Sequence, residues 1–262
     1  MFITPNWSAP YNIRALCTTR NASLSNQSSD ELGFSLPPYN AFNLATHVGD
    51  NAAHIQKNRH LLYEQACLPN VPFWLDQQHT TKTVCLDSMT ASTWQAPVAD
   101  ASWTTQANLV SVVMTADCIP MLVTNKSGTL VSAIHAGWKG LAEGIVSQSL
   151  QALPDTPNNL LVWIGPCIRQ PNFEVGEDVY TEFTATNPKT RRFFKSIASE
   201  PEQKYLADLA GLLNLELKQF GVNEIYDSGM CSYAQSEQFY SYRREGVTGR
   251  MASLIWIEAE NR

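Results

Sequence analysis

Leu109-Val110-Ser111-Val112-Val113-Met114 is the first of three apolar runs in the centre of the chain. The second is Ile119-Pro120-Met121-Leu122-Val123-Thr124, and the third covers residues 129–134, after a turn at Asn125-Lys126-Ser127-Gly128. Short runs that are rich in β-branched residues and separated by a glycine turn are typical of buried strands. Residues 109–134 therefore predict the centre of a buried β-sheet.

Similar patterns predict further strands on both sides of this centre, at residues 12–19, 73–75, 81–86, 160–164, 239–242 and 253–257. Apolar residues near helical spacing predict helices over residues 51–67, 141–153, 177–186 and 205–220. We expect Asn51 to cap the first helix, and the polar residues 20–40 to form a surface loop that is a candidate lid. Because strands and helices do not alternate regularly, we expect an α/β fold that is a single-domain, mixed-sheet layered sandwich over residues 1–262.

Composition narrows the functional classes. The 262 residues carry 24 acidic and 18 basic side chains, a net charge of −6, which disfavours nucleic acid as a partner because such proteins usually present a basic face. No run approaches the roughly 20 apolar residues that span a bilayer, and the first residues lack the pattern of a signal peptide. Six scattered cysteines without a CxxC pair indicate reduced thiols. We expect a cytoplasmic monomer or homodimer without a membrane partner.

Three distant residues, His79, Cys118 and His135, form a candidate metal site. Each is expected at a turn or a strand end, and three strand ends can meet at one edge of a sheet. Two imidazoles and one thiolate leave a tetrahedral Zn²⁺ one ligand short, so that water or a substrate atom can take the open position. This donor set predicts an enzyme with zinc as its cofactor, and it can also hold one Cu²⁺.

Other interpretations of the same residues stay open. A free cysteine is among the most buried residue types and usually only packs. The gaps of 39 and 17 residues between the three candidates match no compact zinc motif. Cys118 would also serve as an activated thiolate, with His135 or His79 as the base and Asp117 as the orienting group. Such a pair would belong to an amidase or to a metal-free binding protein.

Further polar residues are candidates for proton transfer or substrate binding. Asp117 lies next to the thiol, and Glu174 precedes a predicted helix, so both are candidate acid–base groups. Arg59 and Arg250 are candidates to neutralise a phosphate, as are Arg243 and Arg244. Asn43 opens the polar turn 43–51 and is a candidate substrate contact, whereas Asp50 and Asn51 in the same turn are expected to cap the following helix.

Five blocks in chain order resemble the YfiH family, also called the laccase-domain or polyphenol oxidase family. The blocks are Asn43-Leu44 with His47-Val48-Gly49-Asp50 and Asn58-Arg59; Gln77-Gln78-His79; Thr115-Ala116-Asp117-Cys118 with Ile134-His135-Ala136-Gly137-Trp138; Ile164-Gly165-Pro166 with Phe173-Glu174-Val175-Gly176; and Phe239-Tyr240-Ser241-Tyr242-Arg243-Arg244 with Thr248-Gly249-Arg250. The resemblance runs from about Thr18 to Ile257. One departure is the first histidine, where the family usually has Gln-Val-His-Gly and this chain has Gln77-Gln78-His79-Thr80.

The resemblance implies one α/β domain similar to the catalytic fold of cytotoxic necrotizing factor. It implies a zinc or copper site at His79, Cys118 and His135. It also implies phosphorolysis of adenosine, inosine and S-methyl-5′-thioadenosine, together with adenosine deaminase activity, so that a purine nucleoside and phosphate are the expected substrates. The older family name implies copper-dependent oxidation of phenols, and members are also linked to the correction of peptidoglycan precursors.

The histidine content favours nucleoside chemistry over oxidation of phenols. Multi-electron oxygen chemistry normally needs several copper ions and many histidine ligands, whereas this chain has five histidines. Two of them belong to the candidate site, and with the thiolate they would hold one copper ion. The expected function is therefore a zinc-dependent purine nucleoside enzyme. The alternatives are a copper-dependent polyphenol oxidoreductase and a Cys–His amidase acting on peptidoglycan precursors.

Overall fold

The computed structural model describes residues 2–21, 33–89, 96–197 and 201–259. The predicted central strands lie in a six-stranded mixed sheet with the order β12-β8-β6-β7-β4-β3. Its members are β3 (Thr83–Cys85), β4 (Ala101–Thr104), β6 (Ile119–Asn125), β7 (Val131–Ala136), β8 (Leu160–Ile164) and β12 (Glu224–Asp227). The two outermost pairs, β12–β8 and β3–β4, are parallel, and the inner pairs are antiparallel.

A second, four-stranded antiparallel sheet packs against the first. Its order is β1-β2-β13-β5, with β1 (Phe2–Ile3), β2 (Ile13–Thr18), β5 (Ser111–Thr115) and β13 (Met251–Ile257). Apolar residues alternate along these strands: Val113 and Ile255 face the six-stranded sheet, whereas Val112 and Leu254 face the opposite side. The alternation is the period-2 pattern of a strand, and it places one hydrophobic core between the two sheets.

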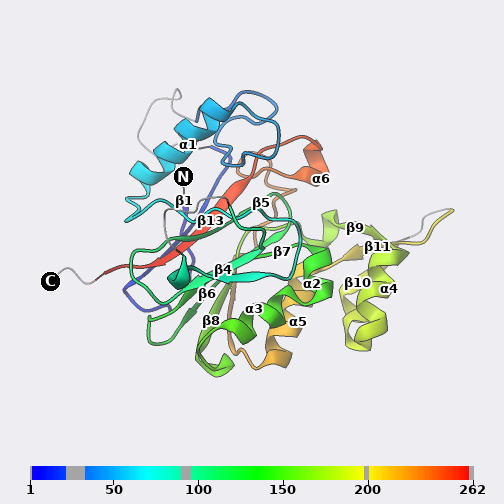
Figure 1. The fold of residues 1–262 in the computed structure, drawn as a ribbon. Coiled ribbons are helices and arrows are strands. Elements are labelled where there is room, and N and C mark those ends of the chain that lie inside the picture. Colours follow the sequence, from blue (N-terminus) through cyan, green and yellow to red (C-terminus); the bar gives the residue numbers. More distant parts are fainter. Residues whose placement is uncertain (1, 22–32, 90–95, 198–200, 260–262) are drawn as a thin grey trace.

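Helices cover both outer faces of the two sheets. Helix α1 (Ala52–Gln65) packs on the four-stranded sheet, and Figure 1 shows it above the sheets, with α3 and α5 below them. The six-stranded sheet carries α2 (Trp138–Glu143), α3 (Ile145–Ala152), α4 (Glu177–Thr186) and α5 (Leu209–Phe220). A small third sheet, β10-β11-β9, lies beside α4 and consists of β9 (Glu174–Gly176), β10 (Phe194–Ile197) and β11 (Lys204–Ala207). The fold is thus the predicted single-domain α/β sandwich, built around a mixed six-stranded sheet.

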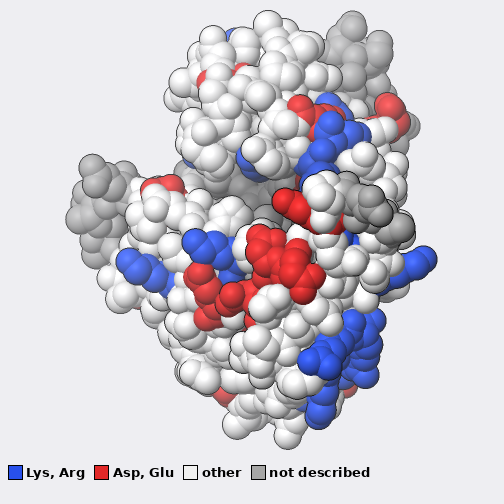
Figure 2. All heavy atoms as spheres, turned by 90° about the vertical axis from the view of Figure 1, so that its right-hand side faces the viewer, with Lys and Arg blue, Asp and Glu red and all other residues white. Residues whose placement is uncertain are grey.

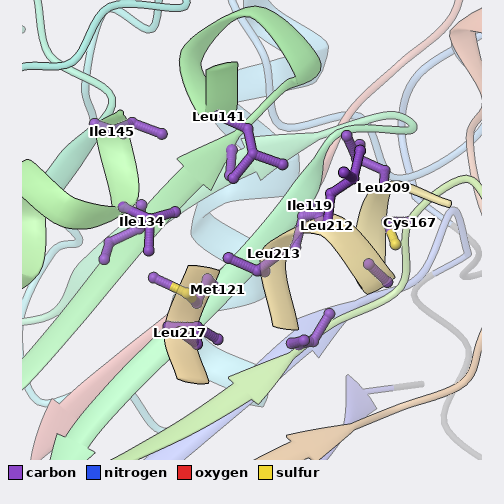
Figure 3. Packing of buried hydrophobic residues seen from close by; sticks show 14 of the residues in the cluster. Ile119, Met121, Ile134, Leu141, Ile145, Cys167, Leu209, Leu212, Leu213 and Leu217 are labelled. Atoms are coloured by element: carbon purple, nitrogen blue, oxygen red, sulfur yellow. The ribbon is translucent and has the colours of Figure 1, made fainter. Parts of the chain in front are cut away.

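The largest hydrophobic core lies between the six-stranded sheet and its helices. Figure 3 shows Ile119, Met121 and Ile134 of the sheet packed against Leu141 and Ile145, and against Leu209, Leu212, Leu213 and Leu217 of α5. All seven residues of β6 are buried. Since both faces of this strand are covered, its sequence is a nearly continuous apolar run rather than an alternating one.

Several predicted elements are confirmed, and others are corrected. Strand 12–19, the three central strands, strand 160–164, strand 253–257 and helix 177–186 are present within one or two residues, and Asn51 caps α1 through a hydrogen bond from the Ala53 amide. The predicted helix 141–153 is two helices instead, because Gly144 adopts a left-handed conformation with φ of 92°. The predicted helix 205–220 begins at Leu209, since residues 204–207 pair as β11.

Two predicted strands are wrong. Residues 73–75 form no strand and make only an isolated bridge from Phe73 to Ser111. Residues 239–242 bury Phe239 and Tyr240 in the core between the sheets, and then enter the short helix α6 (Tyr242–Glu245) with Ser241 as its N-cap. Both segments are apolar because their side chains pack in the core, although their backbones form no strand. The predicted strand 81–86 shortens to β3, and residues 22–32 of the candidate lid lie outside the described residues.

Charged side chains are mixed over the face that Figure 2 presents, where basic and acidic groups of the described residues lie next to one another. A separate group of basic side chains lies toward the lower right of that view. A search of the described residues for helices that could cross a membrane finds none with the required length and apolar character.

Candidate active site

The three candidate ligands come together at one edge of the six-stranded sheet. Cys118 lies in the tight turn that joins β5 to β6, and His135 lies in β7, whose register places it opposite Pro120. His79 reaches the same point from the loop before β3, in a left-handed conformation with φ of 58°. The ligand atoms of the three residues lie within 4.8 Å of one another, and the Cys118 Sγ is 3.6 Å from the His79 Nε2. The predicted convergence is therefore present.

Asp100, which the sequence arguments missed, orients both histidines. It is fully buried, its Oδ1 lies 2.8 Å from the His135 Nδ1, and the same oxygen accepts a hydrogen bond from the His79 amide at 3.1 Å. Its Oδ2 accepts hydrogen bonds from the amide and hydroxyl of Thr80. Burial alone would raise the pKa of Asp100, but the hydrogen bonds from His135 and Thr80 outweigh it and lower that pKa. With Nδ1 engaged, the Nε2 of His135 is free to bind a metal.

Gly137 allows the close approach of the other two ligands. A Cβ at this position would lie 2.5 Å from the His79 Cδ2 and 3.0 Å from the Cys118 Sγ. A side chain here would therefore push His79 or Cys118 out of place. Gly137 is part of the third sequence block, and its contribution in this structure is steric.

The electrostatics of the site favour the thiolate that a metal requires. Burial raises the pKa of Cys118, but the positive charge and hydrogen bonds of His135 and His79 outweigh burial and lower it below that of a free thiol. The same coupling, together with Asp100, raises the pKa of His135. Thiolates and imidazole nitrogens are the donors that Zn²⁺ takes in proteins. The residues therefore fit a metal ion held by His79, Cys118 and His135, with a further position left for another ligand.

A cavity of about 530 Å³ opens beside the three ligands. Its wall contains the ligands together with aromatic rings and cationic side chains, namely His47, Trp138, Phe173, Tyr242, Arg243 and Arg250. Gln77 also lines it, but the Gln77 amide exchanges two hydrogen bonds with the backbone of Met114. The cavity thus combines a candidate metal site with aromatic and cationic side chains.

Asp117 lies in the wall of the cavity, but its carboxylate is engaged by the protein. Its Oδ1 accepts a hydrogen bond from the Ser232 hydroxyl at 2.6 Å. Its Oδ2 accepts hydrogen bonds from the Ser241 hydroxyl at 3.0 Å and from the Arg243 amide at 2.7 Å. Asp117 also has a φ of 97°, a backbone conformation that residues other than glycine rarely adopt. These contacts tie the Cys118 turn to the start of α6.

The four arginines named as candidates occupy different environments. Arg250 and Arg243 line the cavity, and neither has a carboxylate within salt-bridge distance among the described residues. Arg244 forms a salt bridge with Glu245 and donates to backbone carbonyls, which makes its contacts internal. Arg59 does not line the cavity, and its guanidinium stacks at 3.8 Å over the Trp74 ring.

Two other candidates also lie away from the cavity wall. Glu174 is exposed on β9, and its backbone carbonyl accepts a hydrogen bond from Arg243. Asn43 is fully buried, and its Oδ1 accepts hydrogen bonds from the amides of Ala45 and Arg250. Asn43 therefore fixes the backbone of Arg250 through a hydrogen bond inside the protein. His47, by contrast, lines the cavity and was not identified as a site residue; the available signal was its place in the first sequence block.

Comparisons with known proteins agree with the sequence blocks. A family model described as multi-copper polyphenol oxidoreductase laccase matches residues 25–258. A purine nucleoside phosphorylase of Haemophilus influenzae is 41% identical over 98% of this chain and 99% of its own length. Purine nucleoside phosphorylase YfiH of Escherichia coli is 39% identical over 97% of this chain and 98% of its own length.

Solved structures share the fold over nearly the whole chain. A crystal structure of a Neisseria meningitidis protein has a TM-score of 0.89 and 39% identity, and it covers 98% of this chain and 99% of that one. The structure of YlmD from Geobacillus stearothermophilus has a TM-score of 0.79 and 26% identity, and it covers 95% of this chain and 93% of that one.

Proposed function

We propose that this chain, which belongs to the laccase-like family that includes the YfiH proteins, is a metal-dependent purine nucleoside phosphorylase. The observation that carries the proposal is the composition of one cavity. The His79, Cys118 and His135 cluster opens into the same space as Arg250, a cation without a carboxylate partner, and as several aromatic rings. The relatives from Haemophilus influenzae and Escherichia coli are named for the same reaction.

In this reaction a phosphate oxygen forms a bond to the ribose C1′ while the bond from C1′ to N9 breaks. The electron pair of the broken bond goes to the purine, and the proton of HPO₄²⁻ balances the one that the purine gains. The products are ribose 1-phosphate and the free base. Adenosine, inosine and S-methyl-5′-thioadenosine are the proposed substrates.

The residues of the cavity divide these tasks. The rings of Trp138, Phe173 and Tyr242 provide surfaces on which a purine stacks. Arg250 offsets the negative charge of phosphate. We propose that the metal ion is zinc. When bound, it would act as a Lewis acid that polarises a substrate oxygen. We assign Asp117 a positioning role and give Glu174 no proton transfer, because its exposed side chain does not line the cavity.

Adenosine deamination is a second candidate activity, favoured by the ligand position that the three-residue donor set leaves free. In that reaction water replaces the amino group at purine C6, and ammonia leaves. Oxidation of phenols has less support. Among the residues that the structure describes, one cluster of three ligands is present, and it suits a single ion.

A product assay tests the proposal. Purified protein is incubated with adenosine or inosine, with and without inorganic phosphate, and the products are separated. We expect adenine or hypoxanthine, with ribose 1-phosphate in equal amount, only when phosphate is present. Inosine formed from adenosine would reveal deamination, and oxygen uptake with phenols would support the copper alternative. Cys118→Ala should contain less than a tenth of the metal of the parent protein; full activity in that variant would overturn the metal-dependent reaction.

A further inference from the structure

Arg250 is a partly buried cation that forms no ion pair with the described residues. Its Nη1 donates to the carbonyls of Thr248 at 2.9 Å and Gly249 at 3.0 Å, and no carboxylate lies within salt-bridge distance. Burial lowers the pKa of Arg250, and the negative charges of Cys118 and Asp117 oppose this only in part. Removing a charge from water is unfavourable unless it is fully compensated, so a site with a partly compensated cation is suited to an anionic ligand.

The protein fixes the backbone that carries this cation. The Arg250 amide donates to the buried Oδ1 of Asn43 at 3.0 Å. A Cβ at Gly249 would lie 2.7 Å from the Tyr240 ring and 2.9 Å from the Asn43 Cβ, so only glycine fits there. The guanidinium is therefore held in place before any ligand binds, which is the arrangement expected of a preorganised anion site.

His47 lines the same cavity from the loop that precedes α1. Its ring has no hydrogen-bond partner among the described residues, whereas the next residue is anchored by a hydrogen bond from the Tyr39 hydroxyl to the Val48 carbonyl at 2.8 Å. Arg250 lines the same cavity as His47. Burial and then the positive charge of Arg250 lower the pKa of His47, and Asp76 opposes them in part. A neutral imidazole offers one donor and one acceptor.

We propose that Arg250 and His47 together form the subsite that binds inorganic phosphate as HPO₄²⁻. The guanidinium donates to the anionic oxygens, a geometry that arginine can satisfy with two parallel hydrogen bonds. The neutral imidazole accepts a hydrogen bond from the phosphate hydroxyl. The role of this subsite in catalysis rests on the proposed phosphorolysis, but phosphate binding itself can be measured without any nucleoside.

Two of the other candidate arginines, Arg59 and Arg243, fit this role less well. Arg59 stacks on Trp74 and donates to the Leu44 carbonyl, outside the cavity wall. Arg243 is exposed, lies over the Phe173 ring and donates to the carbonyl of Glu174, so it holds the small β9 sheet against α6. Arg250 alone of the three combines partial burial, a place in the cavity wall and a rigid support.

Calorimetric titration with inorganic phosphate and with sulfate, at equal ionic strength, tests the subsite directly. We expect Arg250→Gln to weaken phosphate binding at least about tenfold, and Arg250→Lys to weaken it less, because lysine keeps the charge but loses the planar fork. The control is Arg191→Gln, which removes the same charge from an exposed site. Equal phosphate affinity in Arg250→Gln and Arg191→Gln, or a tenfold loss in Arg59→Gln alone, would overturn the assignment.

Sulfate separates the contribution of His47, because it has the shape of phosphate but carries no hydroxyl proton at neutral pH. We expect the parent protein to bind phosphate more tightly than sulfate, and His47→Leu to lose most of that preference while sulfate affinity changes less than twofold. An unchanged preference would remove His47 from the subsite. If phosphate binding behaves as expected but no nucleoside is cleaved, the subsite stands and the proposed phosphorylase activity fails.

Discussion

At the scale of single residues, the metal site depends on two residues that are not ligands. Asp100 sets the orientation of His135 and the backbone of the His79 turn, and Gly137 leaves room for His79 beside Cys118. Neither residue would be recognised from its own chemistry in the sequence. Their effects on metal binding can be measured separately from catalysis.

Replacement of Asp100 by Asn should weaken metal binding about 10–100-fold, because loss of an outer carboxylate partner of a ligating histidine has effects of this size. Chelator competition on the purified protein measures the affinity. Asp155→Asn is the matched control, since Asp155 also accepts several hydrogen bonds but lies away from the site. Equal metal affinity in the two variants would contradict the orienting function of Asp100.

Gly137→Ala should release the metal by steric means, because its Cβ would lie 2.5 Å from the His79 ring. We expect Gly137→Ala to contain less than half of the metal of the parent protein. Without metal, the variant and the parent protein should have similar melting temperatures. Gly140→Ala, in the same helix, is the control, since its Cβ would make only ordinary contacts at 3.5 Å. Metal analysis after gel filtration gives the content, and full occupancy in Gly137→Ala would refute the steric explanation.

At the scale of elements, buried side chains connect segments that are far apart in the sequence. Asp117 joins the turn between β5 and β6 to α6, and Glu216 of α5 accepts a hydrogen bond from the Ser147 amide near the start of α3. The first link aligns the metal ligand with the arginine-bearing segment. The second places an acidic side chain in a helix interface.

Asp117→Asn should lower kcat/KM at least about tenfold while metal content and the shape of the pH profile stay the same. The reason is that the amide cannot accept all the hydrogen bonds from Ser232, Ser241 and Arg243, so α6 shifts relative to Cys118. Ser241→Ala removes one of these donors and should give a weaker form of the same loss. Disappearance of one limb of the pH profile in Asp117→Asn, with Ser241→Ala unaffected, would instead support proton transfer by Asp117.

Glu216 makes stability depend on pH. Burial raises its pKa from 4.5 to about 7, although the Ser147 amide partly opposes this. Between these values the folded protein binds more protons than the unfolded chain, so stability falls as the pH rises through this range. Each pKa unit corresponds to about 1.4 kcal/mol, so the loss above pH 7 is at most about 3 kcal/mol.

We therefore expect Glu216→Gln to be more stable than the parent protein at pH 8 and nearly equal to it at pH 5. Urea unfolding at both pH values measures the difference. Glu237→Gln, at an exposed site, should change stability little at either pH. A parallel pH dependence in Glu216→Gln and the parent protein would rule out Glu216 as its source.

At the scale of the whole molecule, the cavity lies where the two larger sheets and their connections meet. Cys118 joins β5 of one sheet to β6 of the other, and His135 comes from β7. Arg250 immediately precedes β13, so the metal site and the cationic wall belong to different sheets. A bound ion should therefore stabilise the fold as a whole.

Removal of the metal should lower the melting temperature by about 5–10 °C when the free ion had been about 100-fold above its Kd. An ion that binds only the native state adds about 2.7 kcal/mol to the free energy of unfolding under those conditions. For a chain of this size, each kcal/mol changes the melting temperature by a few degrees. Differential scanning calorimetry before and after dialysis against a chelator gives the shift. Cys118→Ala should show no such shift, and an equal shift in that variant would place the stabilising ion elsewhere.

Most of the buried strands and three helices could be predicted from the sequence, because apolar runs and helical spacing are local signals. Residues 239–242 could not, since an apolar segment looks the same whether it pairs as a strand or only packs. The break at Gly144 and the pairing of residues 204–207 with β9 and β10 also depend on neighbours that are distant along the chain.

The sequence by itself determined the three candidate ligands and the buried centre of the sheet, because the affinity of thiolate and imidazole for metals and the apolarity of a strand are properties of the residues themselves. Tertiary structure alone decided which polar side chains join those ligands. Asp100, His47 and Arg250 reach the site, whereas Arg59 and Glu174 do not line the cavity. The physical reason is that the direction of a side chain follows from strand register and helix packing over long separations, such as the 35 residues between Asp100 and His135.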